Sequence, residues 1–100
     1  MDRMAFAIIF SPEAMDDLLA LKANVRAAVR DAIEVHLKHE PTKTSKSRIK
    51  RLRGFSRPQY RLRVEDVRVF YDILEKTVEI LAIVSKEGAD SWLRKAGKFL

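Results

Sequence analysis

The stretch Tyr60–Ser85, YRLRVEDVRVFYDILEKTVEILAIVS, decides the fold because its side chains alternate between apolar and polar. In Tyr60–Val64, apolar residues alternate with arginines, and the alternation resumes over Val67–Ile73. A period of two is typical of strands with one buried face. The dipeptide Glu65-Asp66 between the two runs predicts a tight turn. The stretch therefore predicts two antiparallel strands joined as a hairpin.

A two-residue turn also determines which side chains of the hairpin share a face. One face then carries three arginines and an aromatic residue: Arg61, Arg63, Arg68 and Phe70. The other face is predicted to be core: Tyr60, Leu62, Val64, Val67, Val69 and Tyr71. Since Arg68 points out of the core in this register, we expect the fold to tolerate Arg68→Ala.

The arginines on one sheet face suggest an anionic ligand. Like charges directly opposite each other destabilise a sheet by up to about 1 kcal/mol, and a bound anion removes that cost. Arginine suits phosphate because its planar guanidinium donates two parallel hydrogen bonds. The alternative is an exposed sheet face that happens to be basic.

The first forty residues predict a strand and a helical hairpin. Met4–Phe10 is apolar and β-prone. Ser11 is a favoured N-cap and Pro12 a favoured first helical residue, so a helix begins there. It ends near Lys22, and its apolar face is Met15, Leu18 and Leu19.

A second helix follows, with Asn24 as its candidate N-cap and Pro41 as its limit. Helical spacing relates its apolar positions, which are Val25, Ala28, Val29, Ala32, Ile33, His36 and Leu37. The short link between the two helices predicts an antiparallel hairpin.

The rest of the chain completes a single α+β domain over residues 1–100. Pro41–Pro58 is predicted to be a basic loop with a short strand at Ile49–Leu52, and Val78–Val84 to be a central strand beside the first one. Gly88–Phe99 predicts an amphipathic helix whose inward residues are Ala89, Trp92, Leu93 and Ala96. The order is β-α-α-β-β-β-α, with a two-helix hairpin packed on a small antiparallel sheet.

The positive charge is concentrated in one segment. Ten Lys/Arg less two acids give Lys43–Arg68 a charge of +8, whereas ten less twelve give the other 74 residues −2. This excess favours a polyanionic partner, although a solvated loop is the alternative. The chain has no cysteine, and no signal peptide or membrane-spanning run is evident, so we expect a cytoplasmic protein.

The residues Leu52–Leu93, with LRG, YRLRVEDVRVFYDI and VEILAIVSKEGADSWL, resemble the core of RelE/ParE-type toxins of type II toxin–antitoxin systems. The resemblance covers essentially the whole chain, is most specific over Tyr60–Ser85, and implies a RelE-like fold. It also implies an acidic antitoxin as partner in a hetero-oligomer, and no cofactor, metal or membrane.

RelE-type members cut messenger RNA in the ribosomal A site, so the resemblance implies catalytic roles for Arg61, Arg63, Arg68 and Lys86. Arg68 would hold the scissile phosphate and stabilise the charge of the transition state. Arg61, Arg63 and Lys50 would position RNA, and one of them would help activate the ribose 2′-OH. The further RNA-binding residues are Lys46, Lys50, Arg51 and Arg53.

The chain departs from the RelE pattern at two positions. Glu87 stands where well-known members have a second arginine, and Leu93 where they have a tyrosine. Lys86 or Glu87 is then the candidate acid or base, although Glu87 also suits a helix N-terminus. These departures favour the alternative activity of the superfamily, a ParE-like inhibitor that binds DNA gyrase without nuclease chemistry. The three arginines on one face and Lys86 favour the ribosome-dependent nuclease, which is the leading hypothesis.

Three other features have plainer interpretations. His36 and His39 have metal-ligand spacing but no third ligand, so we interpret them as helix-end histidines. Trp92 is expected to be core rather than a platform for a base. No cofactor-binding motif is present.

Overall fold

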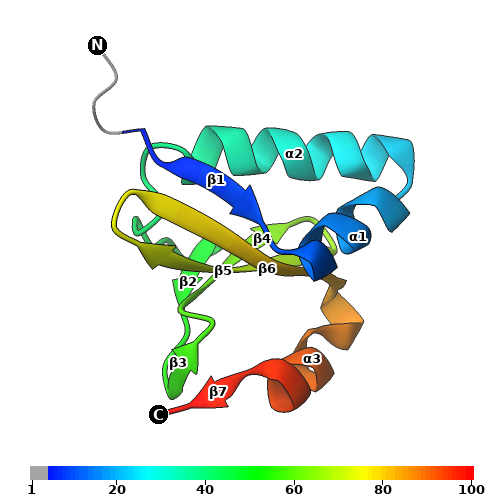
Figure 1. Ribbon diagram of the computed structural model, residues 1–100. Helices are drawn as coiled ribbons and strands as arrows, with labels where there is room; N and C mark the ends of the chain where they lie inside the picture. Colours follow the sequence, from blue (N-terminus) through cyan, green and yellow to red (C-terminus); the bar gives the residue numbers. More distant parts are fainter. Residues whose placement is uncertain (1–4) are drawn as a thin grey trace.

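Two helices cover one face of a five-stranded sheet, and a third helix lies under the other face (Figure 1). The computed structural model describes residues 5–100. Its elements are β1 (Ala7–Phe10), α1 (Pro12–Ala20), α2 (Ala23–Leu37), β2 (Ile49–Arg51), β3 (Phe55–Arg57), β4 (Tyr60–Val64), β5 (Val67–Leu74), β6 (Thr77–Ser85), the 3-10 turn η1 (Lys86–Gly88), α3 (Ala89–Ala96) and β7 (Lys98–Phe99). Within residues 5–100, no helix is both long enough and apolar enough to cross a membrane.

The predicted α+β class and helical hairpin are confirmed, and the details of the helices refine the prediction. Ser11 caps α1, since its hydroxyl accepts a hydrogen bond from the Ala14 amide at 3.0 Å. Leu18 is buried as expected, but Met15 and Leu19 are 38% and 55% exposed. The nine residues of α1 make only two and a half turns, so fewer of its side chains face the sheet than the apolar spacing predicted.

Asn24 does not cap α2, which already begins at Ala23. Arg26 instead secures the link between the helices, because its guanidinium donates to the backbone carbonyl of Leu21 at 2.9 Å and to those of Leu18 and Leu19 at 3.3 Å. The last carbonyls of a helix lack the usual amide partners, so a side-chain donor is favourable there. The Leu18 carbonyl also accepts from the Leu21 amide at 3.2 Å.

The sheet has the strand order β1-β6-β5-β4-β2. The edge strand β1 pairs with β6, as predicted, but it runs parallel to β6 in a sheet that was predicted to be antiparallel, and the other neighbours in the sheet are antiparallel. The first strand was predicted over Met4–Phe10, and within the described residues it begins only at Ala7; Met4 lies outside the described residues.

The predicted hairpin register is confirmed residue for residue, with Val64 opposite Val67 and Arg63 opposite Arg68. The face toward α1 and α2 is the main core. Tyr71 is fully buried there, and its hydroxyl donates to the Pro41 carbonyl at 2.6 Å. Burial raises the pKa of Tyr71, so this phenol stays a hydrogen-bond donor.

The opposite face carries a second, smaller apolar cluster that α3 covers in part. Phe70, which the register placed among the arginines, is fully buried and stacks on Trp92 with ring centroids 4.9 Å apart. Trp92 is therefore part of a core, as expected. Ala96 is exposed, contrary to the prediction, because the helix ends at that residue.

The predicted C-terminal helix is also too long. Lys98–Phe99 forms β7, which pairs with β3 in a two-stranded sheet. The Phe55 and Phe99 rings stack with centroids 4.7 Å apart. This pairing joins residues more than forty positions apart, which local periodicity does not reveal.

Candidate functional site

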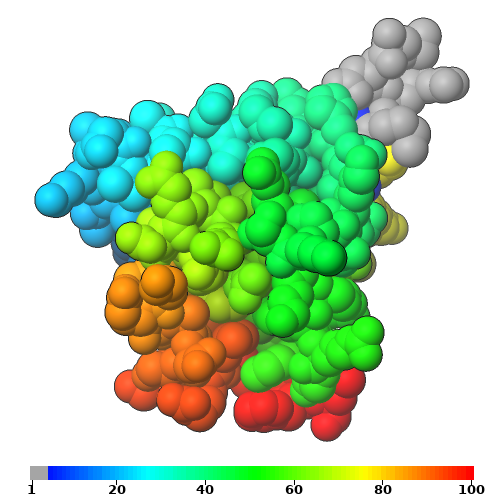
Figure 2. Space-filling view, turned by 180° about the vertical axis from the view of Figure 1, so that it is seen from behind, coloured from blue at the N-terminus to red at the C-terminus, as the bar shows by residue number. Residues whose placement is uncertain are grey.

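Four basic residues share one face of the sheet, on the side of α3. Lys50 lies opposite Arg61 across β2 and β4, and Arg63 lies opposite Arg68 across β4 and β5. We call these four residues the arginine face. Figure 2 looks at the nearby sheet edge, where β4 and its turn (yellow-green) lie between α2 (cyan) and the η1–α3 segment (orange).

Arg61 has the strongest unmet need for an anion. Its Nε is buried and has no hydrogen-bond acceptor among residues 5–100. Burial lowers the pKa of Arg61, and the charges of Arg68 and Arg63 lower it further. The guanidinium is thus held in an environment that opposes its charge, and an anion bound close to Arg61 would relieve this.

Arg68 lies on the predicted face of the hairpin, outside the main core, but it is buried, with only 8% of its surface exposed. Its Nη1 donates to the carbonyls of Glu65 at 2.8 Å and Val67 at 3.1 Å. Arg68 therefore supports the β4–β5 turn, in which Glu65 has a φ of 54°. The hairpin register predicted the correct face for Arg68, but it could not predict that the side chain folds back onto the β4–β5 turn.

Lys86 and Glu87 lie in η1, at the end of β6. The Lys86 ammonium is 3.9 Å from the Asp66 carboxylate, and its amide donates to the Asp66 carbonyl at 2.7 Å. Glu87 is exposed in the first turn of η1, the position that its structural interpretation predicted. The cap itself is Ser85, whose hydroxyl accepts from the Gly88 amide at 3.1 Å.

The loop residues expected to bind RNA are only partly brought to this surface. Lys50 lies on the arginine face, and Lys46 and Arg53 are exposed in the neighbouring segments. Arg51 is paired with Tyr60, lies 5.2 Å from the centre of its ring, and donates to the Gln59 carbonyl. Arg51 thus turns toward the opposite face of the sheet.

The charge on the α3 side of the sheet changes sign along the strands. Asp72 and Glu79 are opposite each other, and Arg57 lies 3.3 Å from one carboxylate and 3.4 Å from the other. Burial raises the pKa of Asp72, against hydrogen bonding from the Gln59 amide and the charge of Arg57. An anion on this side is directed toward the arginines.

The sequence analysis did not anticipate the contact between His36 and Arg48, whose side chains meet at 2.6 Å, Nε2 to Nη1. Burial lowers the pKa of His36, Arg48 lowers it further, and Asp31 opposes both. His36 thus serves as a neutral acceptor. Within residues 5–100, no group of three potential ligands could hold a metal ion.

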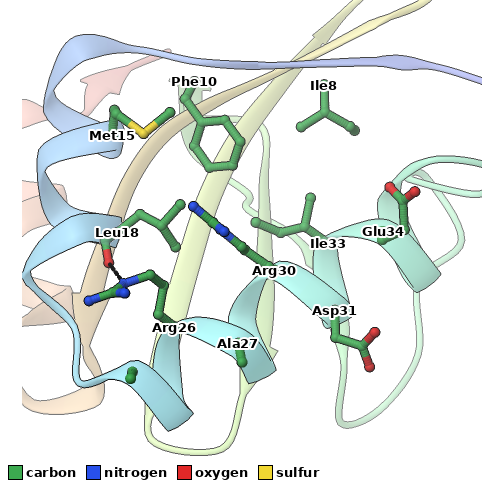
Figure 3. A pocket seen from close by; sticks show the side chains of 11 residues that line it. Ile8, Phe10, Met15, Leu18, Arg26, Ala27, Arg30, Asp31, Ile33 and Glu34 are labelled. Atoms are coloured by element: carbon green, nitrogen blue, oxygen red, sulfur yellow. Dashed lines mark hydrogen bonds between the residues drawn. The ribbon is translucent and has the colours of Figure 1, made fainter.

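A separate hollow of about 640 Å³ lies on the helical side, between β1, α1 and α2. Figure 3 shows its mostly apolar lining, with Phe10 and Leu18 close to the guanidinium of Arg30. This surface contains none of the residues predicted to bind RNA, so it is distinct from the arginine face.

Comparisons with known proteins agree with this architecture. The chain over residues 8–89 matches the family model described as the ParE toxin of the type II toxin–antitoxin system, parDE. A search of curated protein sequences finds no significant match.

Several solved structures are similar. The RelBE2 toxin–antitoxin complex from Mycobacterium tuberculosis matches with a TM-score of 0.68 and 26% identity, covering 83% of this chain and 93% of that one. The archaeal RelE–RelB complex from Pyrococcus horikoshii matches with a TM-score of 0.68 and 22% identity over 83% and 97%. A free variant of the Escherichia coli toxin RelE matches at 0.65 and 19% over 93% and 99%.

The last two likenesses concern the fold alone, whereas the family match covers most of the chain and includes the hairpin that carries the arginines. The chain therefore belongs to the ParE toxin family of type II toxin–antitoxin systems, within the RelE/ParE superfamily.

Proposed function

We propose that this toxin is an endoribonuclease that cuts messenger RNA on the ribosome. The observation that carries the proposal is the buried Nε of Arg61, which lacks an acceptor among residues 5–100 and lies among like charges. An RNA phosphodiester is an anion of suitable shape for this guanidinium. Such an arrangement stabilises charge without reorganisation when the substrate arrives.

We propose a division of roles among these residues that differs from the one the family resemblance implies. Arg61 is the proposed ligand of the scissile phosphate, with Arg63 and Lys50 positioning the strand beside it. Nη1 of Arg68 already donates to two backbone carbonyls, so we assign Arg68 to support of the β4–β5 turn. Its positive charge would also attract the phosphate held by Arg61. Lys86 is the proposed proton-transfer group, since it lies on the rim and is 55% exposed.

The ribosome would supply the remaining organisation by holding the messenger in the reactive geometry. Positioning alone lowers a barrier substantially. This explains how a site with few acid or base groups would act, and it predicts cleavage only during translation. A site organised by the ribosome would also tolerate Leu93 where RelE-type members have a tyrosine, because Leu93 packs in the apolar cluster and has no proton to donate.

The second candidate is inhibition of DNA gyrase by protein binding. The match to the ParE model favours it, as do Glu87 and Leu93 at positions where RelE-type members have arginine and tyrosine. The arginine face would then dock on gyrase or its DNA, and no bond would be cut by the toxin.

One experiment separates the two functions. The protein is added to translating and non-translating lysates, messenger ends are mapped, and gyrase–DNA complexes are trapped in parallel. Codon-phased cuts that appear only during translation support the nuclease. Intact messenger together with accumulated gyrase–DNA cleavage complexes would overturn it in favour of the inhibitor.

The similar toxins from Mycobacterium tuberculosis and Pyrococcus horikoshii are seen in complex with antitoxins, and an antitoxin is the expected partner here too. We propose that an acidic antitoxin segment covers the Lys43–Arg68 surface, whose charge of +8 is ten Lys/Arg less two acids. Opposite charge speeds association and makes it sensitive to salt. Co-expression pull-down with a salt series tests this: equal binding at about 50 mM and about 1 M salt, with Arg61 and Arg63 unprotected, would contradict it.

A further inference from the structure

A hollow of about 470 Å³ opens at the sheet edge between α2 and the end of β4. His36, Ser47, Arg48, Arg63 and Glu65 supply its polar lining, and Ala32 and Val64 add apolar surface. The His36–Arg48 pair also borders a smaller hollow of about 240 Å³, which Lys43, Thr44 and Ser45 help to line. Both hollows therefore border the same His36–Arg48 pair at this edge of the sheet.

Two arginines of the larger hollow lack an acidic partner. Neither Arg48 nor Arg63 forms an ion pair with any carboxylate of residues 5–100. The Arg63 amide donates to the Arg48 carbonyl at 2.8 Å, so the backbone holds the two residues together. Arg48 uses a neutral imidazole as its acceptor, although a charged oxygen makes a stronger hydrogen bond with a guanidinium.

We propose that this hollow is a second phosphate site, which binds an RNA phosphodiester next to the one on the arginine face. The proposal rests on the proposed nuclease function and extends its substrate contacts. Arg63 belongs to both surfaces, since it lies on the arginine face and borders the hollow. A single strand would pass Arg63 at the sheet edge and place its next phosphate between Arg48 and His36.

The chemistry of the pair suits a ligand that arrives and leaves. A phosphate would replace Nε2 as the acceptor for Arg48, and the released imidazole would take up a proton and donate to the same anion. The charged or titratable groups that face His36 are Asp31 on α2, Arg48 before β2, Arg63 and Glu65 around the end of β4, and Glu40 and Lys43 beside the smaller hollow. Glu65 opposes the anion, and the charges of Arg48 and Arg63 offset this repulsion.

The first test uses a six-nucleotide 2′-O-methyl RNA, which cannot be cleaved through its 2′ position, with affinity measured by fluorescence anisotropy. We expect Arg48→Gln to weaken binding about threefold to tenfold and to lower the slope of log affinity against log salt by about 0.7. Arg30→Gln removes the same charge from the other side of α2 and is the matched control. Arg48→Lys keeps the charge and guards against a folding defect.

The second test follows the His36 imidazole by NMR through a pH titration, with and without the RNA. A bound phosphate favours the imidazolium, so RNA should raise the pKa of His36, and binding should tighten as pH falls. His36→Gln should remove that part of the pH dependence. Arg48→Gln should raise the pKa of His36 in the free protein, because one neighbouring positive charge is gone.

The outcomes distinguish this site from the function on which it rests. If the RNA binds and Arg61→Gln weakens it, while Arg48→Gln has no effect and RNA leaves the pKa of His36 unchanged, the second site is refuted and the nuclease proposal stands. If the folded wild-type protein binds no RNA and cuts no messenger during translation, both proposals fail.

Discussion

The two faces of the β4–β5 hairpin are made by alternate residues of the same strands, yet they differ in almost every property. The face under α1 and α2 is closed, with Leu62, Val69 and Tyr71 fully buried. The other face has an apolar end around Phe70 that α3 covers, and a basic end where Arg61 keeps a buried nitrogen without an acceptor among residues 5–100.

The difference between the faces shows that burial alone does not make a core. On the closed face, apolar side chains meet others and the removal of their surface from water stabilises the fold. On the basic end, Arg61 is partly buried without the partner that would compensate its desolvation. We therefore expect substitutions on one face to affect stability and substitutions on the other to affect activity.

The largest effect is expected on the closed face. Leu62→Ala removes a fully buried side chain between the helices and the sheet, and should lower the free energy of unfolding by about 2–5 kcal/mol. Chemical denaturation measures this. Leu74→Ala, at a site 76% exposed, is the control and should change stability by less than about 0.5 kcal/mol. Equal losses from the two would contradict the assignment of the core.

Arg61→Gln should show the opposite behaviour. We expect single-turnover cleavage on saturated ribosomes to fall about 100- to 1,000-fold, as when a preorganised donor to a developing charge is lost. The melting temperature should stay the same or rise, because the substitution removes the repulsion between the charge of Arg61 and those of Arg63 and Arg68. Arg94→Gln on exposed α3 is the control. A folded Arg61→Gln protein with full activity would remove the basis of the proposed site.

Arg68 lies on the basic face but is buried, so its substitution should affect both stability and activity. Because it is buried and donates to two carbonyls, Arg68→Ala should cost about 1–3 kcal/mol of stability and also reduce toxicity. Growth on induction, with a denaturation curve, measures both. Arg63→Ala, at an exposed position across the hairpin, should leave stability nearly unchanged. An Arg68→Ala protein as stable as wild type would show that the turn does not depend on this guanidinium.

The smallest effects are expected at Lys86 and Glu87 in η1, beside the arginine face. Lys86→Ala should slow single-turnover cleavage by at least about tenfold if it transfers a proton, and Glu87→Gln should do much less, because its carboxylate is exposed at the start of η1. If Glu87→Gln is the more damaging change, the glutamate is the base. If neither matters, proton transfer does not involve these two residues.

Local patterns determined much of this protein. The pleat of a strand places every second residue on one face, and a two-residue turn sets the register, so Arg61, Arg63 and Arg68 were assigned to one face from the sequence. The Ser11 cap and the helical hairpin were also predicted, because caps and helical periodicity depend on residues close in the chain.

Only the tertiary structure decided what covers each face. Phe70 is buried because Trp92, more than twenty residues later, stacks on it. The β3–β7 pairing and the His36–Arg48 contact likewise join residues that no local period relates. The shielding of Arg61 and the engagement of Arg68 depend on packing and on side-chain direction. A strand pattern specifies the face of a residue, but its solvation depends on which distant segment lies over it.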